Sequence, residues 1–394
     1  MPNKRQALIF AAGLLGIVFI SALSGGLAGS WVAGRMRPAA PSQNVFRLTN
    51  ASATAFQTPE PTEPTATIRL VPLQMEDYAS RVIPEAMFNR RSPVAALYLN
   101  RKSSVGENAL TQDEQVGRAA AVTADGWFVT SAAVLEGISM AEIVVWLDGK
   151  AYKPERVLAD TATQAVFIKT KAKDLPVTSF ANVWTSRTGS AVWLEPSSGQ
   201  FVPSSIVANR AVSSAEPRSS EKSEKRLLVY GSMQKWERGA PVWDAKGAMV
   251  GILDSSVDGR LTVIPGSGLS SSLQSLVAGG QIQHASLGVL SIDRTAVRAV
   301  SPDANLPDYG AWLREDKKTG RAILANSPAE KAGLKNDDVI LQVDRDIMDD
   351  STDLGDVILQ YRPGASVTLR VWRGGKELDV PVTLGMQVTS RQIP

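Results

Sequence analysis

Short apolar runs separated by turn residues extend from about residue 92 to about residue 278, and they restrict the possible folds more than any other feature of the sequence. The runs are VAALYL, AAAVTADGWFVTSAAVL, EIVVWLDGKAY, QAVFIKT, AVWLEP, RLLVYG and APVWDAKGAMVGIL. The Asp-Gly dipeptides at 125–126 and 148–149 are typical of tight β-hairpins. This pattern predicts an all-β barrel or sandwich rather than a fold of alternating strands and helices.

The length and composition leave room for more than this one region. With 394 residues, 44% of them hydrophobic and 21% charged, the chain can form two folded domains and additional segments. The formal net charge is only +3, because 42 basic residues are nearly balanced by 39 acidic ones. A nucleic-acid-binding protein would be expected to concentrate a basic stripe on its surface. We therefore expect no nucleic-acid partner.

Two residue types that carry much of protein chemistry are absent or nearly so. The chain has no cysteine, which excludes thiol catalysis, disulfide bonds and zinc sites with cysteine ligands. It has a single histidine, His284, so any Ser-His-Asp triad would have to use that residue as its general base. The sequence predicts no metal site and no cofactor.

The N-terminal residues 1–37 predict a membrane anchor. The uncharged stretch from Ala7 to about Ala28 is long enough, as a helix, to cross a bilayer core of about 30 Å. The basic residues before it favour a cytoplasmic N-terminus, with the remaining domains on the periplasmic or extracellular side. A cleaved signal peptide is the alternative, since small residues at 21–29 could form a cleavage site. The Pro- and Thr-rich residues 38–73 are predicted to be a disordered linker.

Three motifs give the β-rich region a resemblance to a known family. GRAAAVTADGWFVTSAAVLEG resembles the first barrel of HtrA/DegS-type trypsin-like serine proteases, DTATQAVFIKT resembles their segment with the catalytic Asp, and WERGAPVWDAKGAMVGI resembles the segment around their nucleophilic Ser. The resemblance implies a mainly β fold, with a trypsin-like double β-barrel in residues 74–280. With the anchor before it and a PDZ-like domain after it, the chain resembles the DegS-like layout.

The departures from the family motifs concern the catalytic positions. The resemblance places the catalytic His at Ala133, the catalytic Asp at Gln164 and the nucleophilic Ser at Arg238. Trp236 stands where the family has a Gly that helps aim an oxyanion-binding N–H. A triad needs a nucleophile, an imidazole and a carboxylate, and all three are replaced. The sequence therefore predicts a degenerate protease domain that is not an enzyme.

A different catalytic constellation is the alternative to this prediction. Ser232 lies near the former nucleophile position, with Lys235 close to it in the sequence, and a Ser-Lys pair can support hydrolysis. Under this alternative the chain is an active serine endopeptidase.

The C-terminal region, residues 281–388, resembles a bacterial PDZ domain, which is a small α+β barrel. The motif SLGV at 286–289 resembles the carboxylate-binding loop of such domains, and NSPAEKAGLKNDDVILQVD resembles a second stretch of theirs. Part of the second motif has a structural cause. Ser327 and Pro328 are typical of a helix N-cap and a first helical position, and Gly333 is typical of a helix end.

The resemblance implies that an extended C-terminal peptide adds as a strand to a sheet edge while backbone N–H groups hold its carboxylate. Gly288 permits the close backbone approach, with an ordinary strand bulge as the structural alternative. The segment 352–361 is predicted to be an amphipathic helix opposite the strand. The predicted peptide-binding residues are Ser286, Leu287, Gly288, Val289, Leu290, Ile292, Leu354, Val357 and Ile358.

The sequence offers more than one interpretation for residues 213–226 and for His284. Residues 213–226, SSAEPRSSEKSEKR, predict a long exposed loop, and in the family a loop of this neighbourhood senses the PDZ domain. His284 is expected to be exposed between the domains, or alternatively to assist a ligand carboxylate and make binding tighten at low pH.

Together these features predict a membrane-tethered, HtrA-like pseudoprotease that binds exposed C-termini of exported or misfolded proteins. Its role would be scaffold, sensor or noncatalytic subunit in envelope protein quality control. A PDZ adaptor whose barrel only spaces the domain from the membrane is a further alternative. The resemblance also implies a homotrimer or a hetero-oligomer with active relatives.

Overall fold

The computed structural model describes residues 84–394 apart from 89–90, 101–108, 178, 182–186, 210–215, 224–225, 298–305 and 318–319. The predicted anchor and linker therefore lie outside the described residues. Within the part of the chain that is described, no helix is long and apolar enough to cross a bilayer.

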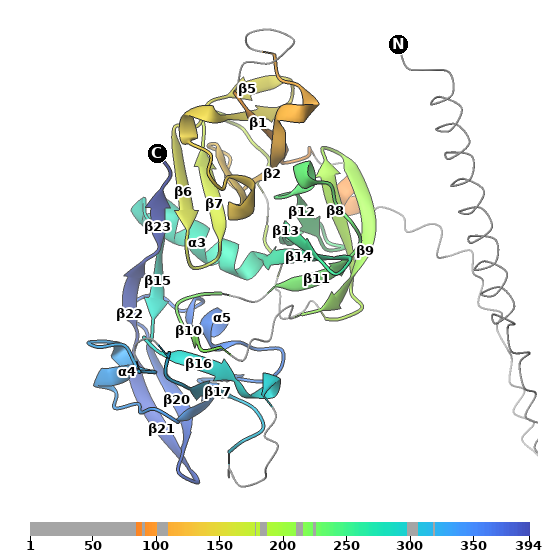
Figure 1. The fold of residues 1–394 in the computed structure, drawn as a ribbon. Helices are drawn as coiled ribbons and strands as arrows, with labels where there is room; N and C mark the ends of the chain where they lie inside the picture. Colours follow the sequence, from red (N-terminus) through yellow and green to blue (C-terminus); the bar gives the residue numbers. More distant parts are fainter. Residues whose placement is uncertain are drawn as a thin grey trace, which may run out of the picture. The chain divides into compact units, whose positions relative to one another are not determined.

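The first barrel is an eight-stranded sheet in the order β23-β6-β7-β3-β2-β1-β4-β5 (Figure 1). Its strands are β1 (Val94–Leu99), β2 (Gln115–Ala121), β3 (Trp127–Ser131), β4 (Ile143–Leu147), β5 (Lys150–Tyr152), β6 (Arg156–Asp160), β7 (Ala165–Lys169) and β23 (Ser390–Gln392). Alternate strand residues point inward and form a buried core that includes Leu97, Phe128 and Ile168. Both Asp-Gly dipeptides form the predicted hairpins, between β2 and β3 and between β4 and β5.

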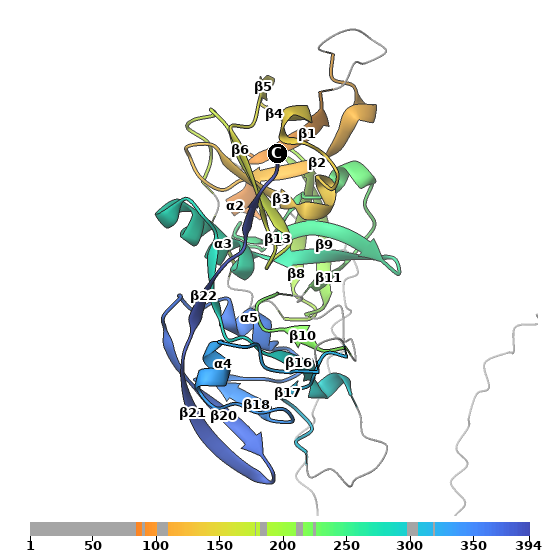
Figure 2. The same cartoon turned by 60° about the vertical axis from the view of Figure 1, so that its left-hand side comes forward.

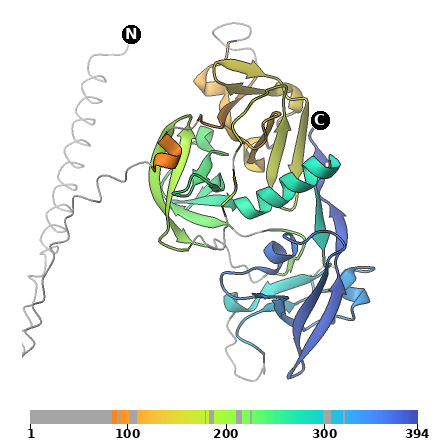
Figure 3. The same ribbon diagram turned by 180° about the vertical axis from the view of Figure 1, so that it is seen from behind.

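The second barrel closes on itself in the order β11-β14-β13-β12-β8-β9. Its strands are β8 (Ala191–Ser197), β9 (Gln200–Ala208), β11 (Leu227–Tyr230), β12 (Pro241–Trp243), β13 (Met249–Val257) and β14 (Arg260–Pro265). Trp243 is wholly buried, and its indole N–H donates to the buried Glu195 carboxylate at 2.9 Å. The long helix α3 (Gly266–Gly279) follows and runs beside the first barrel, as the view from behind shows (Figure 3).

The C-terminal domain has its own sheet, in the order β10-β16-β17-β18-β20-β21 with β19 paired to β18. Its elements are β15 (Gln283–Ser286), β16 (Leu290–Asp293), β17 (Ala311–Leu313), α4 (Pro328–Lys331), β18 (Val339–Val343), β19 (Asp346–Ile347), α5 (Leu354–Ile358), β20 (Ser366–Arg373), β21 (Lys376–Thr383) and β22 (Gly385–Val388). The strand β10 (Arg218–Ser219) comes from the second barrel's chain segment. The predicted mainly β architecture, a trypsin-like double barrel followed by a PDZ domain, is confirmed.

Local sequence signals account for the short helices of the PDZ domain. The Ser327 hydroxyl accepts a hydrogen bond from the Glu330 N–H, Pro328 begins α4, and Gly333 has φ of 75° just after the helix. The helix predicted over 352–361 is shorter in the structure: α5 begins at Leu354 and ends at Ile358.

The C-terminal end of the chain returns to the first barrel. β22 pairs with β15, and β23 then pairs with β6 in the first barrel. Figure 2 shows this last segment leading from the PDZ domain up the side of the barrel.

Candidate functional site

Two of the three predicted triad positions meet in one open pocket. Ala133 lies in the short 3₁₀ helix η3 (Ala132–Val134) directly after β3, and Gln164 lies in the turn between β6 and β7. Both line a pocket with Asp254 of β13 and with Pro394. The topology of the first barrel therefore brings these two positions together as the resemblance implies.

A charged network occupies the space beside Gln164. The Gln164 side-chain oxygen accepts from Arg226 at 2.6 Å, and the Arg226 guanidinium donates to Asp254 at 3.2 Å. The Ser131 hydroxyl also donates to the Asp254 carboxylate. Arg226 is buried, so it neutralises the carboxylate that lies in the pocket. None of these groups is an imidazole that could take a proton from a serine.

Arg238 lies after the 3₁₀ helix η6 (Lys235–Glu237), and it is not among the residues lining that pocket. Its carbonyl accepts from the Arg118 N–H at 2.6 Å. The Arg118 guanidinium lies over the Trp236 ring, 5.2 Å from its centroid, which is a cation–π contact. The segment 236–238 is thus packed against β2 through an arginine and an indole.

The alternative pair, Ser232 and Lys235, lies on exposed chain between β11 and β12. Both side chains are accessible to solvent, so a substrate can reach them. The exposure of both side chains is what the structure adds to the sequence for this pair.

A buried Ser-His-Asp cluster, not anticipated from the sequence, lies at the junction of α3, β6 and β15. The Ser272 hydroxyl donates to the Asp160 carboxylate at 2.6 Å, and His284 Nε2 lies 3.1 Å from the same oxygen. His284 is only 1% exposed, so the expectation that it is exposed or near a ligand carboxylate is wrong. A triad uses the two ring nitrogens for different partners, whereas here Nε2 faces both Asp160 and Ser272.

This cluster strongly favours the ionised form of Asp160. Burial alone would raise the pKa of this carboxyl, but hydrogen bonds and charge from His284, with hydrogen bonds from Ser272 and Thr389, lower the pKa to about 2. The cluster therefore ties α3 and β15 to the first barrel and has no access to substrate.

The predicted carboxylate loop, residues 286–289, turns at Gly288. Gly288 adopts a φ of 83°, which a residue with a side chain rarely adopts. A Cβ at this position would also collide with the side chain of Ser327. Leu287 and Val289 on either side are fully buried in the PDZ core, so their side chains anchor the loop while their N–H groups donate to the side chains of Glu221 and Ser220.

The structure divides the remaining predicted binding residues into two groups. Leu354, Val357 and Ile358 of α5 are buried in the PDZ core. Leu290 and Ile292 of β16 are half-buried, and Ser286 is half-buried at the end of β15. The strand β16 and the helix α5 are the two elements between which the sequence predicts peptide binding.

A segment of the chain itself lies against β16 and the loop 287–289, which was not anticipated from the sequence. Within the described residues 216–223 of the segment predicted to be an exposed loop, Ser220, Glu221 and Ser223 are buried, 217–219 are half-buried, and 216 and 222 are exposed. The strand β10 pairs with β16, and the Glu221 carboxylate accepts from the N–H groups of Leu287 and Gly288. Polar composition suggested solvent exposure, but the Glu221 carboxylate and the Ser220 hydroxyl accept hydrogen bonds from the backbone N–H groups of residues 287–289.

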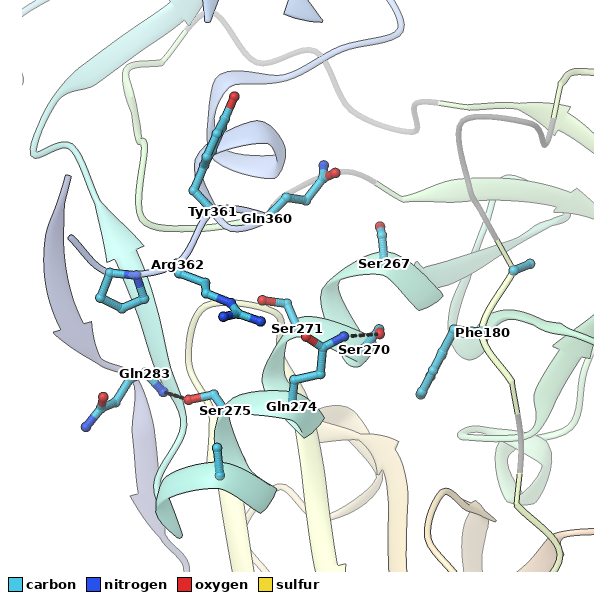
Figure 4. A pocket seen from close by; sticks show the side chains of 13 residues that line it. Phe180, Ser267, Ser270, Ser271, Gln274, Ser275, Gln283, Gln360, Tyr361 and Arg362 are labelled. Carbon is cyan, nitrogen blue, oxygen red and sulfur yellow. Dashed lines mark hydrogen bonds between the residues drawn. The ribbon is translucent and has the colours of Figure 1, made fainter. Parts of the chain in front are cut away.

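A further pocket lies between α3 and the chain that follows α5 (Figure 4). Its walls carry mainly hydroxyl and amide groups, including Ser271 and Gln274, and Arg362 is the one charged residue among them. Figure 4 shows Arg362 pointing toward α3. Among the described residues that line this pocket, none is an aspartate, glutamate, histidine or lysine.

Comparison with known proteins shows which proteins the chain is similar to. The PDZ domain family matches residues 313–384. The chain is 26% identical over 278 residues to the serine protease Do-like HtrB of Bacillus subtilis, covering 67% of this chain and 60% of that protein. It is 25% identical over 318 residues to a probable periplasmic serine endoprotease, DegP-like, of Rhizobium meliloti, covering 79% of this chain and 61% of that protein. A protein of the same name from Halomonas elongata is 29% identical over 281 residues, covering 67% of this chain and 55% of that protein.

Solved structures agree with the fold. The HtrA-type protease AlgW with decapeptide has a TM-score of 0.52 at 19% identity, covering 77% of this chain and 98% of that one. The same protease with tripeptide has a TM-score of 0.53 at 22% identity, covering 77% and 96%. The chain is an HtrA-like protein with a trypsin fold and a PDZ domain.

The prediction that this HtrA-like protein is not an enzyme is contradicted by the comparison. Its relatives are named serine proteases or serine endoproteases, and the structural neighbours are named proteases. The prediction rested on Ala133, Gln164 and Arg238 alone. The assignment of these three positions to the family's triad came from motif resemblance and does not exclude catalysis by other groups of the chain. The HtrA-like protein spans about 60% of the length of the curated relatives that it matches.

Proposed function

We propose that this HtrA-like protein is an extracytoplasmic, membrane-anchored component of envelope protein quality control that binds the C-termini of other proteins through its PDZ groove. The proposal includes the domain bounds 74–280 and 281–388 and a scaffold or sensor role. Relatives named periplasmic support the location. Neighbours named as protease structures with a decapeptide or a tripeptide support the kind of ligand.

One observation carries the proposal: three consecutive backbone N–H groups, those of Leu287, Gly288 and Val289, face the end of a groove beside the edge of β16. A free strand edge pairs the main chain of an extended peptide, and successive N–H groups hold a carboxylate. The same three groups already bind oxygen atoms of the chain itself, so their orientation suits an anion.

The first prediction concerns recognition of the free carboxylate. Titration calorimetry of the full chain with a hexapeptide that ends in a free carboxylate and an apolar side chain should show binding. Amidating the peptide C-terminus should weaken binding by about tenfold or more, because the N–H groups then face no charge. Equal affinities for the two peptides would contradict the proposal.

Two glycines provide a matched control for this experiment. Gly288 and Gly364 both have φ of 83°, but only at Gly288 does an added Cβ meet another residue. Gly288→Ala should reduce peptide affinity, whereas Gly364→Ala should carry a similar backbone strain and leave affinity unchanged. Loss of affinity in both variants would attribute the effect to general destabilisation of the domain.

A second candidate function, serine endopeptidase activity, is favoured by the names of the relatives. Ser232 with Lys235 is the candidate pair that the sequence offers for hydrolysis. Both lie on exposed chain.

The second prediction tests this candidate directly. If the pair is catalytic, the full chain labels with a fluorophosphonate probe and cleaves unfolded casein, and Ser232→Ala abolishes both. Ser256→Ala, which changes another exposed serine, should leave both unchanged. Absence of labelling and cleavage in the unmodified protein would remove this candidate, while labelling that survives Ser232→Ala would assign the nucleophile to another serine.

A further inference from the structure

The edge of the PDZ sheet that a peptide ligand would use is covered by the chain's own segment Arg218–Ser223. β10 runs antiparallel to β16, with Arg218 opposite Ser291 and Ser219 opposite Leu290. The pairing continues past the strand, because the Ser220 N–H donates to the Val289 carbonyl at 3.0 Å. Figure 1 shows β10 beside β16 and close to α5. This is the antiparallel strand addition by which a peptide adds to a sheet edge.

The segment ends with a carboxylate at the position where a peptide ligand would end with its own. Oε1 of Glu221 accepts from the N–H of Leu287 at 3.0 Å and from the N–H of Gly288 at 2.6 Å. The hydroxyls of Ser219 and Ser220 donate to the same carboxylate at 2.6 and 2.8 Å. Glu221 is only 6% exposed. Short hydrogen bonds to a charged acceptor are among the strongest in proteins.

The helix wall of the groove also fits this segment. A Cβ at Gly355 of α5 would collide with the backbone carbonyl of Lys222, so only glycine allows the segment to pass at this distance. The Ser223 hydroxyl donates to the Asp356 carboxylate on the next residue of α5. The segment therefore contacts β16, the carboxylate loop and α5, the three surfaces that a PDZ ligand uses.

We propose that Arg218–Ser223 is a built-in ligand of the PDZ groove, with the Glu221 side chain standing in for a C-terminal carboxylate. The inference rests on the proposed peptide-binding function. An external peptide with a free carboxylate and an apolar last side chain must displace this segment to bind. Its apparent affinity is then lower than the intrinsic affinity by the fraction of molecules in which the groove is open.

The test compares peptide affinity in the full chain with and without the Glu221 carboxylate, using the free-acid hexapeptide as the probe. Glu221→Ala should tighten binding by about tenfold or more, since it removes the charged group that closes the groove. Lys222→Ala changes the exposed neighbouring side chain and should leave affinity within about twofold, because only its backbone carbonyl lies in the groove. Glu221→Gln keeps the size and one acceptor oxygen but removes the charge. Its peptide affinity should lie between those of Lys222→Ala and Glu221→Ala.

Hydrogen exchange provides a second readout that does not depend on the peptide. Glu221→Ala should accelerate exchange of the N–H groups at 287–289, and bound peptide should restore their protection while residues 216–223 stay exchangeable. Circular dichroism and thermal melts of each variant establish that it is folded, and Glu221→Gln replaces Glu221→Ala if the latter unfolds.

The possible results separate the two proposals. If the unmodified protein and both Glu221 variants bind the free-acid peptide equally, and better than the amide, the built-in ligand is overturned while the PDZ function stands. If none of them prefers the free acid, the proposed function fails. In that case unchanged exchange at 287–289 in Glu221→Ala overturns the built-in ligand as well.

Discussion

At the scale of single residues, the chain uses charge in buried positions mainly to hold segments together. Asp160 collects hydrogen bonds from β15 and α3, and Asp254 collects them from Arg226 and Ser131. Removing one partner from such a group leaves a buried charge without compensation, which is more costly than the loss of an exposed ion pair. These residues are therefore where single substitutions should change stability most.

Asp160 gives a prediction with a defined pH dependence. Its pKa is lowered to about 2 in the folded protein, below the ordinary value of 3.8, so the ionised carboxylate stabilises the fold. This contribution, on the order of 2 kcal/mol, is complete above about pH 4 and is lost as the pH falls from about 4 to about 2. Asp160→Asn should lower the free energy of unfolding by about this amount at pH 7, and the difference should disappear near pH 2.

Urea denaturation at several pH values measures this effect. Asp113→Asn, at an exposed carboxylate, is the matched control and should change little at any of them. A difference between Asp160→Asn and the unmodified protein that stays constant from pH 7 to pH 2 would show that the carboxylate's charge is not the cause.

At the scale of elements, the short strand β23 has a larger role than its three residues suggest. It is the edge of the first barrel's sheet and pairs Arg391 with Ala159 of β6. The N–H of Ile393 donates to the Val157 carbonyl, and the N–H of Thr161 donates to the Thr389 carbonyl. The alternation of an antiparallel ladder then directs the N–H of Arg391 toward β6.

This geometry predicts different outcomes for two substitutions at one exposed position. Arg391→Pro removes the N–H donor and should lower the free energy of unfolding by about 1 to 3 kcal/mol, whereas Arg391→Ala keeps it and should cost little. Thermal and urea denaturation of both variants measure the difference. Equal destabilisation would mean that the arginine side chain, rather than the backbone pairing, holds β23 in place.

At the scale of the whole molecule, the sequence predicted what depends on local signals. The hairpins at the Asp-Gly pairs and the N-cap at Ser327 follow from neighbouring residues, and the double barrel and PDZ domain follow from motif resemblance. The contact of Glu221 with Gly288 joins residues 67 positions apart, and no local pattern specifies it. For the same reason the burial of His284 against Asp160, 124 positions away, was not predicted.

The return of the chain through β22 to β23 affects the mechanics of the PDZ domain. The domain is joined to the barrels at both ends, through α3 and β15 at its start and through β22 and β23 at its finish. A domain on a single linker can tumble on its tether, whereas this one is also held by the pairing of β10 with β16. Wider motion of the PDZ domain would require β23 to separate from β6 and β10 to separate from β16, so the backbone bonds of two short strands resist it.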